Sequence, residues 1–205
     1  MSGIGVQYVT GLTIDSFTRT ETEIAFWGIG HHMGIPSAQN PDRELLSHVK
    51  DYSESTRDPF VRLYRTSSNI RCHCDATDIV GLLCLHPAKS GGQSRIVSTV
   101  TLFNQLMLER PHLAPCMFEP FRMDLSGEIR SGATPYNLIT PSRFAQGQLR
   151  TFYHSDYFRS VERHEGIELT PAEREILDYY DEKGLDPSFY LDMSLEQGDI
   201  QFVSS

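Results

Sequence analysis

The sequence has no run of basic residues, and this absence limits the partners that the protein can have. It contains 18 Lys and Arg against 27 Asp and Glu, which gives a formal net charge of −9. A surface with this balance repels the phosphates of nucleic acids and the anionic face of a membrane. We therefore expect neither nucleic acid nor membrane as a partner.

Long apolar stretches are also missing, and none approaches the roughly 20 residues that cross a bilayer. The first residues, MSGIGVQYVTGL, lack a basic segment followed by an apolar one, so they do not resemble a secretory signal. The four cysteines, two of them at Cys72 and Cys74, do not form the pattern of a disulfide framework. We expect reduced thiols and a cytoplasmic protein.

The composition that is present suits one folded domain. Hydrophobic residues make up 39 % and charged residues 22 % of the chain, which is ordinary for a globular protein. Internal repeats, low-complexity tracts and linkers are not found, so we predict a single domain over residues 1–205. Short strands interrupted by a few helices predict a mainly β fold with flanking helices, of the sandwich or jelly-roll kind.

Three segments are predicted to form strands. Residues 5–14 read as a strand that ends in a turn, and residues 59–68 alternate between apolar and polar. Residues 79–85, IVGLLCL, form a continuous apolar run, which predicts a strand buried on both faces.

Three helices are predicted from their capping residues. The first begins after Thr20, which forms a capping box with Glu23, and ends near Gly34. The second lies between Ser98 and Pro111. The third spans residues 171–184, with Thr170 as its cap and Glu173 completing a capping box. The residues predicted for the apolar face of the second helix are Val100, Phe103, Leu106 and Met107.

Two glycine clusters resemble nucleotide-binding motifs without matching them. In GIGHHMG (28–34), Met33 stands where the third glycine of G-x-G-x-x-G belongs, and the segment lies late in a predicted helix. The stretch SGGQS (90–94) lacks the lysine of a phosphate-binding loop. Both clusters are interpreted as structural turns or helix ends.

The stretch NIRCHCDATD (69–78) contains residue types that bind metals. Successive side chains of a strand point to opposite faces, so His73 and Asp75 would share one face, with Cβ atoms roughly 7 Å apart. Cys72 and Cys74 would share the other face. A His-x-Asp pair is two thirds of the 2-His-1-carboxylate triad that holds iron(II) in non-haem oxygenases.

Other interpretations of this stretch remain open from the residues alone. The pattern H-x-D is short enough to recur by chance, and a polar pair at a strand end is the alternative. A zinc site on Cys72 and Cys74, as in a cupin-like binding protein, would need two further ligands at matching spacing, and the sequence offers none. Cys84 and Cys116 are isolated, and we expect Cys72 and Cys74 to be small buried hydrophobic residues.

A longer stretch carries a family resemblance. HCDATDIVGLLCLHPAKSGGQSRIVS, continued by TLFNQL and RPHLAPCMFEPF, resembles the taurine hydroxylase-like (TauD/TfdA) family of iron(II)/2-oxoglutarate dioxygenases. In that family a His-x-Asp pair precedes an apolar strand, a Gly-Gly-x-Ser/Thr turn and a helix that ends at Arg-Pro. The same parts stand here in the same order, and the resemblance extends to GIGHHMGIPSAQN upstream and LEQGDIQFV downstream.

The resemblance implies a role for several residues. His73 and Asp75 match the first two iron ligands, Ser94 matches the hydroxyl that binds 2-oxoglutarate, and Asn69 lies where some relatives contact substrate. It also implies a double-stranded β-helix, a distorted jelly roll with helices packed outside. The implied reaction is the hydroxylation of a small organic molecule by dioxygen. Within the family, the sequence is more similar to the relatives that act as tailoring enzymes in secondary metabolism.

The end of the sequence departs from the family pattern. Relatives continue from a Gly-Asp turn and a strand to a distal histidine, the third iron ligand, and an arginine that pairs with 2-oxoglutarate. Here Gly198 and Asp199 are followed by IQFVSS. The other histidines after Asp75 stand in different contexts, and His154, in YHSDY, is expected in a surface loop. We therefore expect an incomplete β-helix that lacks the usual C-terminal segment, with a non-catalytic truncated remnant or binding protein as the alternative function.

Overall fold

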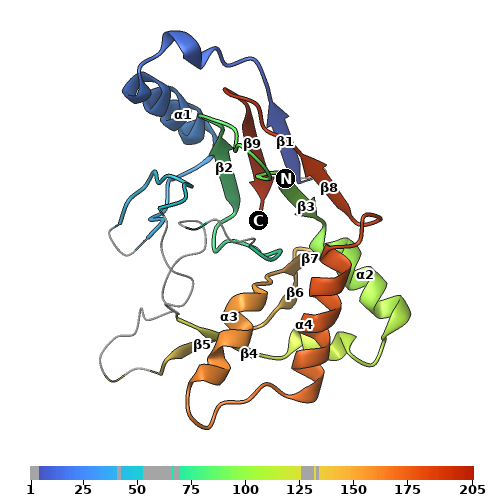
Figure 1. Ribbon diagram of the computed structural model, residues 1–205. Helices are drawn as coiled ribbons and strands as arrows, with labels where there is room; N and C mark the ends of the chain where they lie inside the picture. Colours follow the sequence, from blue (N-terminus) through green and yellow to red (C-terminus); the bar gives the residue numbers. More distant parts are fainter. Residues whose placement is uncertain (1–4, 41–42, 53–65, 67–69, 126–131, 133) are drawn as a thin grey trace. The chain divides into compact units, whose positions relative to one another are not determined.

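The computed structural model describes residues 5–40, 43–52, 66, 70–125, 132 and 134–205 (Figure 1). The chain divides into two compact units. The first comprises residues 1–48, 75–94 and 192–205, and the second residues 49–74 and 95–191. The prediction of one domain stays a prediction. The strand predicted over 59–68 lies outside the described residues except for Thr66.

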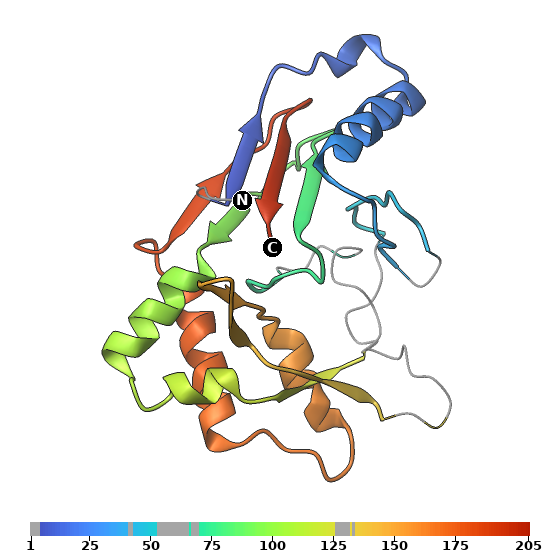
Figure 2. The ribbon, with the colours of Figure 1, turned by 180° about the vertical axis from the view of Figure 1, so that it is seen from behind.

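The first unit contains a three-stranded antiparallel sheet. Its strands are β1 (Val6–Val9), β2 (Ile79–Leu83) and β9 (Ile200–Ser204), in the order β1-β9-β2 (Figures 1 and 2). Val203 lies opposite Val6 on one side and Val80 on the other. The strands predicted within 5–14 and 79–85 are confirmed, but burial of the second on both faces is wrong. β9 takes the central position and is buried over its first three residues, whereas β2 borders only β9 among the described strands and is mostly half-buried.

The helix predicted after residue 20 is α1 (Arg19–Met33), preceded by the short 3-10 helix η1 (Ile14–Ser16). Its cap is Thr18 rather than Thr20. The Thr18 hydroxyl accepts from the Glu21 N–H at 3.3 Å, and the Glu21 carboxylate accepts from the Thr18 N–H at 2.7 Å. The segment TRTETE contains two T-x-x-E patterns, and extended backbone at Thr18 (ψ 162°) selects the earlier one. The predicted end at Gly34 is confirmed.

The two T-x-x-E patterns give a matched pair of variants. Thr18→Ala should lower the free energy of unfolding by about 1 kcal/mol, because it leaves an amide at the helix start without its acceptor. Thr20→Ala should change it by less than about 0.5 kcal/mol. Urea denaturation followed by circular dichroism measures both, and an equal loss in the two variants would contradict the assignment of Thr18 as the cap.

The second unit packs helices against antiparallel hairpins. The helices are α2 (Thr99–Glu109), η3 (Ala114–Phe118), α3 (Ser155–Arg159), η4 (Ser160–Arg163) and α4 (Pro171–Gly184). The hairpins are β4 (Phe121–Asp124) with β5 (Tyr136–Ile139), and β6 (Ser142–Ala145) with β7 (Gln148–Thr151). A further two-stranded pair, β3 (Ser94–Val97) with β8 (Tyr190–Met193), has residues in both units. Residues with almost no exposed side chain include Leu106, Met117, Phe121, Phe158, Ile176 and Leu177.

The predicted caps of α2 and α4 are confirmed. The Ser98 side chain accepts from the Thr101 N–H, and Thr170 and Glu173 form the expected capping box. The predicted face of α2 is only partly right, because Leu102 is buried together with Phe103 and Leu106. Val100 and Met107 are 40 % and 47 % exposed. The apolar residues of this helix satisfy two overlapping stripes, and packing selects the one that contains Leu102.

The short antiparallel strands and the helices beside them confirm the predicted class, mainly β with flanking helices. None of the helices in the described ranges combines the length and the apolar character that crossing a membrane requires.

Candidate metal centre

Side chains of the segment 71–75 alternate between two environments. Arg71, His73 and Asp75 are exposed, whereas Cys72 is half-buried and Cys74 is only 7 % exposed. Burial thus alternates along this segment as the two-faced interpretation predicts, whereas the shared face of His73 and Asp75 stays a prediction. The segment is not a regular strand, however, because it pairs through one isolated antiparallel bridge, between His73 and His154.

The imidazole of His73 is oriented by the backbone. Its Nδ1 lies 2.9 Å from the carbonyl oxygen of Arg71. A carbonyl can only accept a hydrogen bond, so Nδ1 carries a proton, and in the neutral imidazole Nε2 carries the lone pair. Histidines that bind metals commonly have this second contact, which fixes the tautomer and the ring orientation. His73 therefore fits the role of a nitrogen ligand through Nε2.

The two cysteines make contacts expected of protonated thiols. The Sγ atom of Cys74 lies 3.8 Å from the Thr151 carbonyl oxygen, and that of Cys72 lies 3.8 Å from the Gly184 carbonyl oxygen. Burial raises the pKa of the Cys72 thiol. Zinc requires the thiolate, so these surroundings favour the small-hydrophobe interpretation over a zinc site.

The backbone of Asp75 is held by the residue that follows β9. The Asp75 N–H donates to the Ser205 hydroxyl at 2.6 Å, and this hydroxyl lies 3.1 Å from the Asp75 carbonyl oxygen, to which it donates. The Ser205 N–H donates to the Asp78 carbonyl at 3.1 Å. The carboxylate of Asp75 thus stands on a segment with a fixed main chain.

His73 belongs to the second unit and Asp75 to the first. Among the described residues, no three His, Cys, Asp or Glu side chains cluster as a metal site.

The predicted 2-oxoglutarate contact, Ser94, follows a turn that requires glycine. Gly91 and Gly92 have φ angles of +69° and +74°, in the left-handed region. A Cβ atom on Gly92 would also lie 2.8 Å from the Cβ atom of Ala88, whereas one on Gly91 would meet nothing within 4 Å. Ser94 is half-buried and opens β3. The predicted substrate contact, Asn69, lies outside the described residues.

This turn gives a second matched pair of variants. Gly91→Ala should cost about 1 to 2 kcal/mol of unfolding free energy, because alanine disfavours positive φ. Gly92→Ala should cost about 1 kcal/mol more, because its methyl group also meets Ala88. Thermal and urea unfolding of both variants checks the difference, and Gly92→Ala proving no worse than Gly91→Ala would argue against the close contact with Ala88.

His154 was expected in a surface loop, and this expectation is wrong. It is half-buried, its ring stacks on that of Tyr157 with centroids 3.9 Å apart, and its ring centroid lies 4.9 Å from that of His73. No local pattern in YHSDY or in RCHCD specifies this pairing, because the two segments are far apart in the sequence. The sequence alone therefore did not reveal that His154 lies beside His73.

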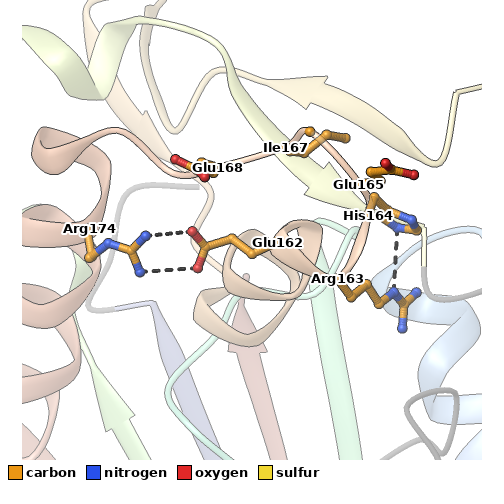
Figure 3. Close-up of a pocket in the computed structure, with 8 residues that line it drawn as sticks. Glu162, Arg163, His164, Glu165, Ile167, Glu168 and Arg174 are labelled. Carbon is orange, nitrogen blue, oxygen red and sulfur yellow. Dashed lines mark hydrogen bonds and ion pairs between the residues drawn. The ribbon is translucent and has the colours of Figure 1, made fainter.

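A hollow of the second unit lies elsewhere. It has a volume of about 590 Å³ and is lined by residues 162–168 and Arg174 (Figure 3). Glu162 and Arg174 form a two-point ion pair there, with N–O distances of 2.5 and 3.1 Å. No predicted site residue lines this hollow.

Residues 2–204 match the family model for taurine catabolism dioxygenase TauD, TfdA family, which confirms the resemblance found in the sequence. The chain is 30 % identical over 203 residues to FR-33289 synthase of Streptomyces rubellomurinus, covering 98 % of this chain and 60 % of that protein. It is 28 % identical over 130 residues to taurine hydroxylase-like protein SAT17 of Stachybotrys chartarum, covering 58 % of this chain and 33 % of that protein. The chain thus spans less than two thirds of the length of either relative.

A solved structure from Burkholderia xenovorans, assigned by its description to the alpha-ketoglutarate dependent 2,4-D dioxygenases, superposes with a TM-score of 0.46 at 18 % identity. The superposition covers 65 % of this chain and 57 % of that one.

Proposed function

Because the chain belongs to the taurine catabolism dioxygenase TauD/TfdA family, we propose that it is an iron(II)- and 2-oxoglutarate-dependent dioxygenase that hydroxylates a small organic molecule. The observation that supports this proposal is the family match over residues 2–204, a range that contains His73, Asp75 and Ser94. The names of the relatives do not agree on one substrate, so the proposal is limited to the class of reaction. We also propose a tailoring step in secondary metabolism, in keeping with the similarity to a Streptomyces synthase.

Each proposed ligand has a role that its surroundings support. His73 would bind iron through Nε2 while its Nδ1–H stays on the Arg71 carbonyl. Asp75 would bind it through the carboxylate, with its main chain held by Ser205. Ser94, after the Gly91-Gly92 turn, would donate its hydroxyl to a carboxylate of 2-oxoglutarate. When bound there, iron(II) with 2-oxoglutarate and dioxygen would supply the oxidation of a C–H bond, with succinate and carbon dioxide as the coproducts of 2-oxoglutarate.

Anaerobic titration of the 205-residue chain with iron(II) and 2-oxoglutarate tests the proposal. The wild type should develop a metal-to-ligand charge-transfer band, because 2-oxoglutarate chelates the bound metal. His73→Ala and Asp75→Ala should lose the band, and His112→Ala, which changes an exposed histidine outside the His-x-Asp pair, should keep it. Admission of dioxygen should then yield succinate. A wild type that gives neither band nor succinate would contradict the proposal and favour the non-catalytic binding protein.

A further inference from the structure

We propose that His154 is a metal ligand beside His73, so that the two imidazoles together bind one divalent transition-metal ion. The inference rests on the proposed function for the role of His73. It adds a nitrogen donor from YHSDY, a segment outside the family motifs that point to His73, Asp75 and Ser94.

The backbone places these two histidines directly opposite each other on neighbouring segments. His73 and His154 are partners in an antiparallel bridge. The Cys74 N–H donates to the Tyr153 carbonyl at 2.6 Å, so the hydrogen bond joins the residue after His73 to the residue before His154. This arrangement defines a non-hydrogen-bonded pair, in which opposite side chains lie on one face and nearer to each other than in a hydrogen-bonded pair.

The spacing of the rings suits two ligands of one ion. Their centroids lie 4.9 Å apart and their planes are tilted by 39°. Two imidazoles at neighbouring positions around a metal have centroids roughly 4.5 to 5 Å apart when the metal–nitrogen bonds are about 2.1 Å long. The observed separation lies in this range, and imidazole nitrogen is a good donor for iron, cobalt, nickel and zinc.

Both rings are also held by their neighbours. The Arg71 carbonyl fixes the ring of His73, and the ring of Tyr157 lies against that of His154 with an interplanar angle of 7°. The Arg71 guanidinium lies 3.4 Å from the Asp156 carboxylate, an ion pair that joins the two histidine-bearing segments a second time. A pair oriented in this way loses little side-chain freedom when it binds an ion.

Calorimetric titration of the full chain with Co²⁺ alone tests the pair. Three single variants are compared with the wild type: His73→Ala, His154→Ala and, as the control, the exposed His112→Ala. His73→Ala and His154→Ala should each weaken Co²⁺ binding by at least roughly 10- to 100-fold. This is the loss that follows when a metal ligand loses its outer-shell hydrogen-bond partner. His112→Ala should bind as the wild type does.

The outcomes separate this inference from the proposed function. If His73→Ala weakens binding and His154→Ala does not, the two-histidine site is wrong and the role of His73 stands. If both weaken binding but the wild type forms no charge-transfer band with iron(II) and 2-oxoglutarate, the pair stands and the proposed function fails. If neither variant changes the affinity, both histidine assignments are wrong.

A measurement on the wild type covers the case in which His154→Ala fails to fold. Substoichiometric Co²⁺ should broaden the ring resonances of His73 and His154 together in the NMR spectrum, and leave those of His112 sharp. Broadening of His73 without His154 would overturn the pair.

Discussion

Gly198→Ala should lower the free energy of unfolding by about 2 to 5 kcal/mol, the sum of roughly 1 to 2 for positive φ and 1 to 3 for overpacking. Gly198 has a φ angle of +86°, and a Cβ atom there would lie 2.1 Å from the carbonyl oxygen of Leu12. That contact is with backbone, so no side-chain rotation can relieve it. A loss of this size is a large share of the total stability of an ordinary domain, about 5 to 15 kcal/mol.

The turn at Gly198 cannot easily move away from Leu12, because hydrogen bonds fix it on the other side. The Gly198 N–H donates to the Cys84 carbonyl, and the Cys84 N–H donates to the Asp199 carbonyl, both at 2.9 Å. The Asp199 carboxylate accepts from the Glu196 N–H at 2.8 Å and also from the Tyr8 hydroxyl. This hydrogen bond to Asp199 raises the pKa of Tyr8 to about 12, which keeps the phenol protonated as a donor throughout the neutral range.

Gly11→Ala is the matched control for Gly198→Ala. Gly11 has a similar φ angle of +89°, but a Cβ atom there would meet nothing within 4 Å. It should therefore cost only about 1 to 2 kcal/mol, the contribution of backbone conformation alone. Urea denaturation of both variants measures the two losses. Equal losses would show that the contact with Leu12 is relieved and that conformation accounts for the whole effect.

Asp124→Ala should be the most damaging charge deletion in the second unit, costing about 3 to 5 kcal/mol. The Asp124 side chain has no exposed surface. One carboxylate oxygen lies 2.5 Å from the Arg163 guanidinium and the other lies 2.9 Å from Nε2 of His164. Removing the carboxylate leaves a cavity and a partly buried guanidinium without its counter-charge. Asp124→Asn, which keeps the size and removes the charge, separates these two contributions.

Glu175→Ala is the control for this deletion. Glu175 forms an ion pair of 2.7 Å with Arg110, but its side chain is 42 % exposed. Water and salt screen such a pair, so its loss should cost about 0 to 1 kcal/mol. The midpoint of urea unfolding, compared among wild type, Asp124→Ala and Glu175→Ala, measures the contrast. A loss for Asp124→Ala no greater than that for Glu175→Ala would contradict the structural role assigned to the buried carboxylate.

The sequence by itself determined the features that depend on a few neighbouring positions. The caps at Ser98 and Thr170 are such features, because a capping side chain bonds an amide only three residues away. The alternation that separates His73 and Asp75 from Cys72 and Cys74 follows from the geometry of extended backbone. The order of motifs that identifies the family is likewise a property of the sequence alone.

Only the tertiary structure decided between local patterns of similar strength and joined segments far apart in the sequence. It selected Thr18 over Thr20 as the cap of α1, and the stripe with Leu102 over the stripe with Val100 on α2. It also placed β9 between β1 and β2, and His154 opposite His73. Such pairings depend on backbone hydrogen bonds and packing between distant residues, and side-chain periodicity within one segment carries no information about which distant segment becomes its partner.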